Sequence, residues 1–308
     1  VIVSPITDPG TLSAIILNGL KPRLADSKPD SYNMGVEQFS ARLTPAVSGA
    51  VIVHAAGQAA DIEAIAAAAR ARGIKVVEDC SQAHGARHKS RLVGGFGDIA
   101  AYSTMYRKAH AAGPSGGLVY SRDLDLFRRA LAHADRGKPR WRGDFDDRDP
   151  SGYMFPALNF NTDELSCAIG VASLGRLDDT IRRRQAFVMD FVARLIDRAD
   201  VCRPYACAPG DSPFFLPVVV DVARIACAKT ELAEAVRAEG IDLNPHYKYL
   251  VADWPWLRPY LADDFDPPNA RSIRDRSFNL YLNENYGEAE VADAVAAIVK
   301  VEGRYARI

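Results

Sequence analysis

Short apolar runs alternate with longer segments of mixed polarity through the first third of the chain. The runs are rich in Val and Ile, as is typical of strands that are buried on both faces of a parallel sheet. The intervening segments of about 10 to 15 residues carry Ala, Arg and Glu and favour crossover helices. The pattern predicts strands at residues 1–6, 22–26, 49–54, 75–79, 99–103 and 117–121.

Helical periodicity is clearest in two segments. Residues 61–72 place their apolar side chains on one face, and Gly73 follows as a C-terminal cap. Residues 163–195 predict a long helix that is interrupted near Gly175. Between these segments, residues 138–150 are rich in Arg and Asp and contain prolines at both ends, which predicts a surface loop.

The pattern changes after residue 200. A strand is predicted at 214–221, a helix at 229–239 and a closing helix at 288–301. We therefore expect an α/β fold with two domains, a large domain with a mostly parallel sheet at 1–200 and a small α+β domain at 201–308. Because residues 1–6 already read as a core strand, the N-terminal part of the large domain is expected to be missing.

The composition narrows the function classes. The 308 residues are 48% hydrophobic and 25% charged, as in ordinary globular proteins. A net charge of −1 with both signs interspersed argues against nucleic-acid or membrane-surface binding. Five widely spaced cysteines show no metal-ligand spacing and favour a reducing cytoplasm, and no stretch reaches the roughly 18 apolar residues of a membrane span. We expect a cytoplasmic protein that acts on a small molecule, without a metal.

Two segments contain residues suited to chemistry. Asp79 ends a predicted buried strand, at the edge where open α/β sheets bind ligands, although an aspartate there is equally suited to cap a helix. The second segment runs from Ser103 through Lys108 into a Gly-rich bend at 113–117. Most lysines are solvated surface charges, but a lysine between a strand and such a bend, downstream of Asp79, favours a functional site.

These segments together resemble the DegT/DnrJ/EryC1/StrS family of pyridoxal 5′-phosphate (PLP)-dependent sugar aminotransferases. The resemblance extends over essentially the whole chain, and each motif occurs in the family's order. It implies a fold-type I PLP transferase. The matching stretches are 78–86 (EDCSQAHGA), 94–98 (GGFGD), Ser103 followed by Lys108, 158–165 (LNFNTDEL) and 244–247 (NPHY).

The resemblance also implies roles for individual residues. Lys108 corresponds to the catalytic Schiff-base lysine, and Asp79 to the partner of the cofactor's ring nitrogen. Gln82 would lie against the ring or its 3-hydroxyl group, and Ser103 would donate to the cofactor phosphate. Asn159 would reach the phosphate of a neighbouring subunit, which implies a homodimer with shared active sites.

The implied reaction moves an amino group from an amino acid, with glutamate as the expected donor, to a keto sugar that is often nucleotide-linked. His246 and Tyr247 would lie on the substrate side. One alternative is a PLP-dependent dehydratase, a branch in which histidine replaces the lysine; Lys108 argues against it, and the nearby His110 leaves it open. A second alternative is a non-catalytic regulator or partner subunit of the same fold.

The chain departs from the family at several positions. The family has an aromatic residue, which stacks on the cofactor ring, directly after the strand-end Thr; here Thr7 is followed by Asp8. Asn161 replaces a family arginine, and the bend at 113–117 is longer by one residue and lacks the family's glutamate. The family's phosphate-binding turn would precede residue 1, so we expect an incomplete phosphate site.

Overall fold

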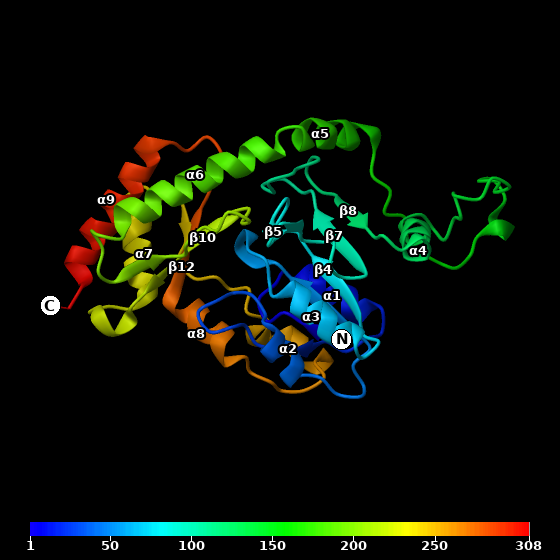
Figure 1. The fold of residues 1–308 in the computed structure, drawn as a ribbon, viewed down its shortest axis with the longest axis horizontal. Coiled ribbons are helices and arrows are strands. Elements are labelled where there is room, and N and C mark those ends of the chain that lie inside the picture. Colours follow the sequence, from blue (N-terminus) through cyan, green and yellow to red (C-terminus); the bar gives the residue numbers. More distant parts are fainter. Residues whose placement is uncertain (308) are drawn as a thin grey trace.

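The computed structural model describes residues 1–307, which form two main β-sheets flanked by helices and a small two-stranded sheet (Figure 1). The larger sheet has six strands in the order β2-β1-β3-β4-β7-β8. All neighbouring strands are parallel except β7 and β8. The strands are β1 (Ile2–Val3), β2 (Arg23–Leu24), β3 (Gly49–Val53), β4 (Lys75–Asp79), β7 (Ile99–Ser103) and β8 (Gly117–Tyr120).

The helices of the first half pack against this sheet. They are α1 (Pro9–Leu17), α2 (Val36–Ala41) and α3 (Ile62–Arg70). The main core of the large sheet joins Ile52 of β3 and Val76 of β4 to Ile62 and Ile65 of α3 and Phe39 of α2, all fully or almost fully buried. A small hairpin follows β4 and consists of β5 (Arg87–His88) and β6 (Arg91–Leu92).

The polypeptide then leaves the body of the molecule. After α4 (Leu124–Ala134), an arm of residues 135–160 extends outward at the right of Figure 1. The chain returns through α5 (Glu164–Leu174) and the long α6 (Leu177–Leu195), which runs across the top of the view toward the second sheet. The predicted break at Gly175 is confirmed, since α5 ends just before it and α6 begins after Arg176.

The second sheet is antiparallel, with the strand order β11-β12-β10-β9. Its core includes Phe187 and Phe191 of α6, so this helix supplies part of the wall of the C-terminal half. The elements are β9 (Cys202–Pro204), β10 (Phe215–Val220), α7 (Lys229–Ala238), β11 (Leu243–Asn244), α8 (Pro268–Arg276), β12 (Ser277–Tyr281) and α9 (Glu288–Tyr305).

The strands predicted at 75–79 and 99–103 have the predicted bounds, and Gly73 adopts the left-handed φ of 68° expected of a C-terminal cap. The first two strands are shorter than predicted, because Pro5 and Pro22 lack the N–H group that a ladder needs. The domain boundary at residue 200 stays a prediction. Within residues 1–307, no helix is both long and apolar enough to cross a membrane.

Candidate active site

The carboxyl end of β4 holds Asp79 in a fixed orientation. Its Oδ1 accepts a hydrogen bond of 3.1 Å from the backbone N–H of Ser81, in the turn after the strand. Its Oδ2 accepts one of 2.9 Å from the hydroxyl of Thr11, on the first turn of α1. Asp79 therefore lies at the strand end where α/β sheets bind ligands, and each carboxylate oxygen has one protein donor.

Lys108 follows the end of β7, the neighbour of β4 in the sheet. Its Nζ lies 4.8 Å from the centroid of the Phe214 ring, in a cation–π contact with a residue of the C-terminal half. Burial lowers the pKa of the Lys108 ammonium, and the carboxylates of Asp79 and Asp8 oppose this shift. The structure thus gives Lys108 a half-buried amine on which the charge of Asp79 acts, and the role of Lys108 as the Schiff-base lysine stays a prediction.

Gln82 bridges the two halves of the chain. Its Oε1 accepts a hydrogen bond of 3.0 Å from the backbone N–H of Ala56, and its Nε2 donates to the hydroxyl of Tyr247 at 3.1 Å. Tyr247 is only 8% exposed and stacks on Tyr32 at 5.7 Å. Both ends of the Gln82 amide are therefore held by protein groups, and Tyr247 contacts it from the loop at 244–249.

Ser103 ends β7, and its backbone N–H donates to Ser81 Oγ at 3.2 Å. Its own hydroxyl makes no hydrogen bond within residues 1–307, so it has a free donor and a free acceptor. His246 directly precedes Tyr247 in the same loop, and its Nδ1 is 3.3 Å from the Nζ of Lys229. Burial and the Lys229 charge lower the pKa of His246.

Asn159 is located elsewhere. It pairs with Asp135 across the base of the arm, and its Oδ1 accepts a hydrogen bond of 3.1 Å from the backbone N–H of Asn161. Both of these contacts are with residues at the base of the arm or directly after it. Ser81 thus links Asp79 to Ser103 through hydrogen bonds, Gln82 follows Ser81 in the chain, and the charge of Asp79 acts on Lys108. Asn159, in contrast, is exposed on a segment that points away from the body (Figure 1).

Comparison with known proteins assigns the chain to a family. The sequence profile of the DegT/DnrJ/EryC1/StrS aminotransferase family matches residues 1–299. The chain belongs to this family. The spore coat polysaccharide biosynthesis protein SpsC of Bacillus subtilis is 27% identical over 303 residues, which are 97% of this chain and 78% of that protein. The GDP-perosamine synthase of Caulobacter vibrioides is also 27% identical, over 98% of this chain and 78% of its own.

Solved structures agree on the fold of this DegT/DnrJ/EryC1/StrS family member. Helicobacter pylori PseC, an aminotransferase involved in pseudaminic acid biosynthesis, superposes with a TM-score of 0.88 at 18% identity, over 98% of this chain and 79% of that one. The Escherichia coli GDP-4-keto-6-deoxy-D-mannose-3-dehydratase, with bound hydrated PLP, gives a TM-score of 0.85 at 18% identity, over 96% and 79%. The predicted family, fold type, enzyme class and PLP cofactor are confirmed.

The residues of the family member's site suit PLP. The cofactor requires an amine to attach its aldehyde, an acceptor for its ring N–H and donors for its phosphate. Lys108 supplies a half-buried amine, Asp79 a carboxylate already fixed by two donors, and Ser103 a hydroxyl with no partner within residues 1–307. Asp8 stands where the family has an aromatic residue after the strand-end Thr. In this structure Asp8 caps α1 by accepting a hydrogen bond from the backbone N–H of Gly10 at 2.8 Å.

Two contacts of the site were not predicted from the sequence. Thr11, which donates to Asp79, lies on α1, a helix that the apolar pattern did not indicate; the Asp8-Pro9 pair is a helix-start signal that would have revealed it. Phe214, which lies against Lys108, is far away in sequence and has no local signal.

Glu78 lies in β4 directly before Asp79, and it holds the loop at 94–97 that precedes β7. Its carboxylate is fully buried and accepts hydrogen bonds from the backbone N–H groups of Gly94, Phe96 and Gly97 and from His54 Nε2. This cluster fixes the residue next to Asp79.

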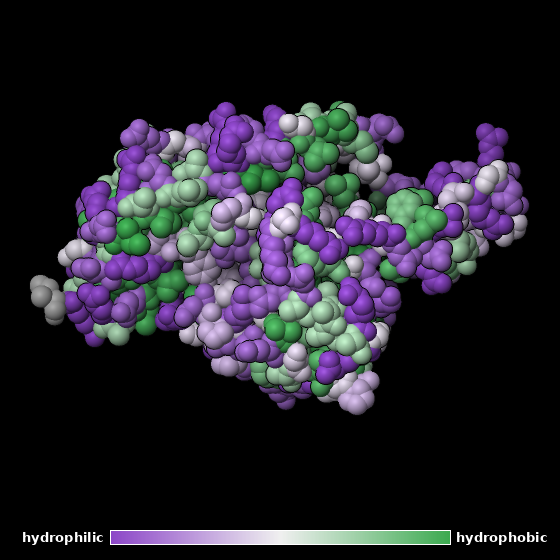
Figure 2. Space-filling view, viewed as in Figure 1, coloured by the Kyte–Doolittle hydropathy of each residue, from purple (hydrophilic) through white to green (hydrophobic). Residues whose placement is uncertain are grey.

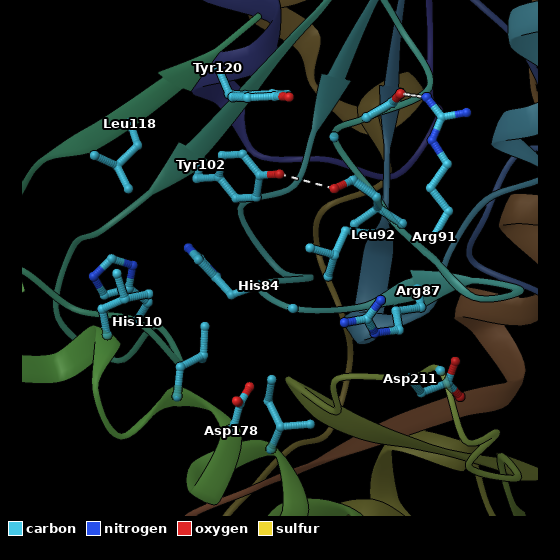
Figure 3. A pocket seen from close by; sticks show the side chains of 18 of the residues that line it. His84, Arg87, Arg91, Leu92, Tyr102, His110, Leu118, Tyr120, Asp178 and Asp211 are labelled. Carbon is cyan, nitrogen blue, oxygen red and sulfur yellow. Dashed lines mark hydrogen bonds between the residues drawn. The ribbon is translucent and has the colours of Figure 1, made fainter. Parts of the chain in front are cut away.

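A cleft of about 1030 Å³ opens between β7 and β8 on one side and α5 and α6 on the other (Figure 3), and Asp79, Gln82, Ser103 and Lys108 are not part of its lining. His84, Tyr102 and His110 line its inner end, and Leu118 of β8 lies at its rim. Burial, together with the charges of His110 and Lys108, lowers the pKa of His84 to about 4, so this histidine is neutral at physiological pH. His84 and His110 are thus both buried side chains.

Proposed function

We propose that the protein transfers an amino group from an amino acid, with glutamate as the expected donor, to a keto sugar. The observation that carries this proposal is the half-buried Lys108 amine, on which the charge of the carboxylate of Asp79 acts, while two donors hold that carboxylate in place. Family membership supplies the reaction class. The relative named GDP-perosamine synthase supports a nucleotide-linked sugar as the acceptor.

In this proposal each site residue has a chemical task. Bound PLP supplies an electron sink that stabilises negative charge at the carbon carrying the amino group. The Lys108 Nζ would hold the cofactor, and the same amine would carry a proton to and from that carbon. Burial lowers the pKa of Lys108, which favours the neutral amine that can accept a proton. Asp79 accepts the ring N–H, and its negative charge favours the protonated ring.

The remaining residues orient the groups that react. Ser103 donates its free hydroxyl to the phosphate. Gln82 lies against the ring, with its amide held by Ala56 and Tyr247. His246 lies at the edge of a second cleft of about 920 Å³, together with Tyr249, and we assign the acceptor sugar to this side. The dehydratase alternative is disfavoured because Lys108 occupies the position where that branch has histidine.

Absorbance spectroscopy of the purified protein with PLP tests the proposal. The parent should show the visible band of lysine-linked PLP, and glutamate should shift it. Lys108→Ala should show no such band, whereas Lys21→Ala, a matched change at an exposed lysine, should behave like the parent. A band that persists unchanged in Lys108→Ala would refute the assignment and favour a non-catalytic protein of the same fold.

The proposed enzyme is a homodimer in which two chains complete each site. Apolar side chains are exposed over α5 and the base of the arm, where Figure 2 shows a hydrophobic surface beside α5 and over α4. Leu165 and Val171 of α5 are each 73% exposed, and Phe160 is 69% exposed. Large exposed apolar side chains gathered in this way favour an interface. A second copy that covers it would bring the arm, with Asn159, to its partner's site.

Subunit complementation tests this arrangement. Lys108→Ala and Asn159→Ala are each expected to be inactive alone. Co-expressed, they should form hybrids with one intact site, and about a quarter of the parental activity should return if the chains pair at random as a twofold dimer. If Asn159 acts within its own chain, no activity will return. Light scattering of each variant shows whether the dimer forms in both cases.

A further inference from the structure

A chain of two hydroxyl groups leads from the end of β1 to Asp79. Thr7 Oγ1 and Thr11 Oγ1 are 2.8 Å apart, and Thr11 Oγ1 donates to Asp79 Oδ2 at 2.9 Å. Thr7 is 2% exposed, so water does not compete for its hydroxyl. The contact places the first turn of α1 directly against the carboxylate that faces the cofactor site.

The direction of these hydrogen bonds follows from counting protons. A hydroxyl has one hydrogen to donate and two lone pairs to accept with. Thr11 uses its hydrogen on the ionised Asp79, so it can only accept from Thr7, and Thr7 must be the donor. The sequence of donation is therefore Thr7 to Thr11 to Asp79. Hydrogen bonds aligned in this way polarise one another, so the bond that reaches the carboxylate is strengthened.

The second donor to Asp79 comes from a different element. The backbone N–H of Ser81 holds Oδ1, while Thr11 holds Oδ2. Two donors from separate elements fix the plane of the carboxylate, and each oxygen keeps a lone pair for a further donor. Thr11 is the side chain in this arrangement that a substitution can remove, because the Ser81 donor is backbone.

We infer that Thr11 is a positioning residue that orients Asp79 toward the cofactor ring nitrogen and supports its negative charge, with Thr7 supporting Thr11. This inference rests on the proposed function, since it assumes that Asp79 accepts the ring N–H. Thr11 touches neither cofactor nor substrate in this assignment and acts only through Asp79.

The test uses Thr11→Val, Thr11→Ser and Thr7→Val in the full-length protein, with PLP as the probe. Valine has the shape of threonine without the hydroxyl, and serine keeps the hydroxyl. The readouts are the dissociation constant of PLP and the visible circular dichroism of the bound cofactor, which reports the orientation of its ring. Melting temperature in the absence of PLP reports any general loss of stability.

We expect Thr11→Val to bind PLP about tenfold more weakly, as for the loss of one hydrogen bond to a charged group, with altered visible dichroism. Thr11→Ser should restore both readouts to the parental values. Thr7→Val should give values between those of the parent and those of Thr11→Val. Parental affinity and dichroism in Thr11→Val would overturn the inference. If Thr11→Val does not fold, unchanged readouts in Thr7→Val would overturn it instead. Failure of the proposed function is distinct, because the parent itself would then lack the lysine-linked PLP band.

Discussion

Glu78→Gln is the substitution whose effect the structure predicts most sharply. Glu78 Oε1 accepts from the backbone N–H groups of Phe96 and Gly97 at 2.7 and 2.6 Å. Its Oε2 accepts from the backbone N–H of Gly94 at 2.6 Å and lies 3.1 Å from His54 Nε2. Four donors converge on two buried oxygens. Glutamine has nearly the same shape but presents one oxygen and an NH₂ group that only donates.

The histidine cannot adapt to this change. His54 Nδ1 accepts from the backbone N–H of Ala60 at 3.1 Å, so neutral His54 carries its proton on Nε2 and must donate toward residue 78. Whichever way the glutamine amide turns, two donors then face its NH₂ group. Each buried donor without an acceptor costs about 1–3 kcal/mol, and removal of a buried charge partner costs about 3–5 kcal/mol. We therefore expect a loss of about 3–5 kcal/mol of folding stability.

The loss should also depend on pH. Burial alone would raise the pKa of Glu78, but the hydrogen bonds from His54, Gly97 and Gly94 outweigh burial and lower the pKa below its ordinary value of 4.5. A carboxyl group with a lowered pKa stabilises the folded state above its unfolded pKa, and this stabilisation disappears as pH falls through the folded value. The difference between parent and Glu78→Gln should be full at pH 7 and shrink below pH 4.5.

Urea denaturation followed by tryptophan fluorescence and by circular dichroism measures this difference. The matched control is Glu63→Gln, the same substitution at an exposed glutamate that pairs with Lys89 on the surface. The control should leave the denaturation midpoint close to that of the parent. A midpoint for Glu78→Gln that equals the control's, or a difference that does not change with pH, would refute the hydrogen-bond account.

Two further predictions concern residues around the site. Asp8→Asn keeps a side-chain oxygen to cap α1 but removes a charge that raises the pKa of Lys108. The pH midpoint for modification of Lys108 by an amine-reactive reagent in PLP-free protein should therefore fall, and a rise would contradict the assignment. Gly57→Ala should abolish or strongly impair folding, because Gly57 has a φ of +83° and an added Cβ would lie 1.8 Å from the carbonyl oxygen of Ser212. Gly240→Ala, with a φ of +96° but open space around it, should melt only slightly below the parent in the same thermal assay.

Local patterns predicted the elements of the site better than the contacts within it. β4 and β7 were predictable because each is a short apolar run with clear ends, a pattern typical of a buried strand. α1 was missed because its sequence, rich in small and apolar residues, has no clear polar face, and only its Asp8-Pro9 start is diagnostic. The contact between Gln82 and Tyr247 joins residues 165 positions apart. No local propensity encodes such a pairing, which depends on how the two sheets pack.

The position of helix α6 predicts which fragments of the chain can fold. Near its first turns, Ile181 packs against the turn after β4, where a Cβ added to Gly85 would lie 2.5 Å from its Cδ1. Farther along, Phe187 and Phe191 complete the core of the second sheet. Helix α6 therefore completes the core of the second sheet, whereas on the side of the large sheet it borders the cleft. A fragment that begins after α6 should accordingly expose its interior and fail to fold alone.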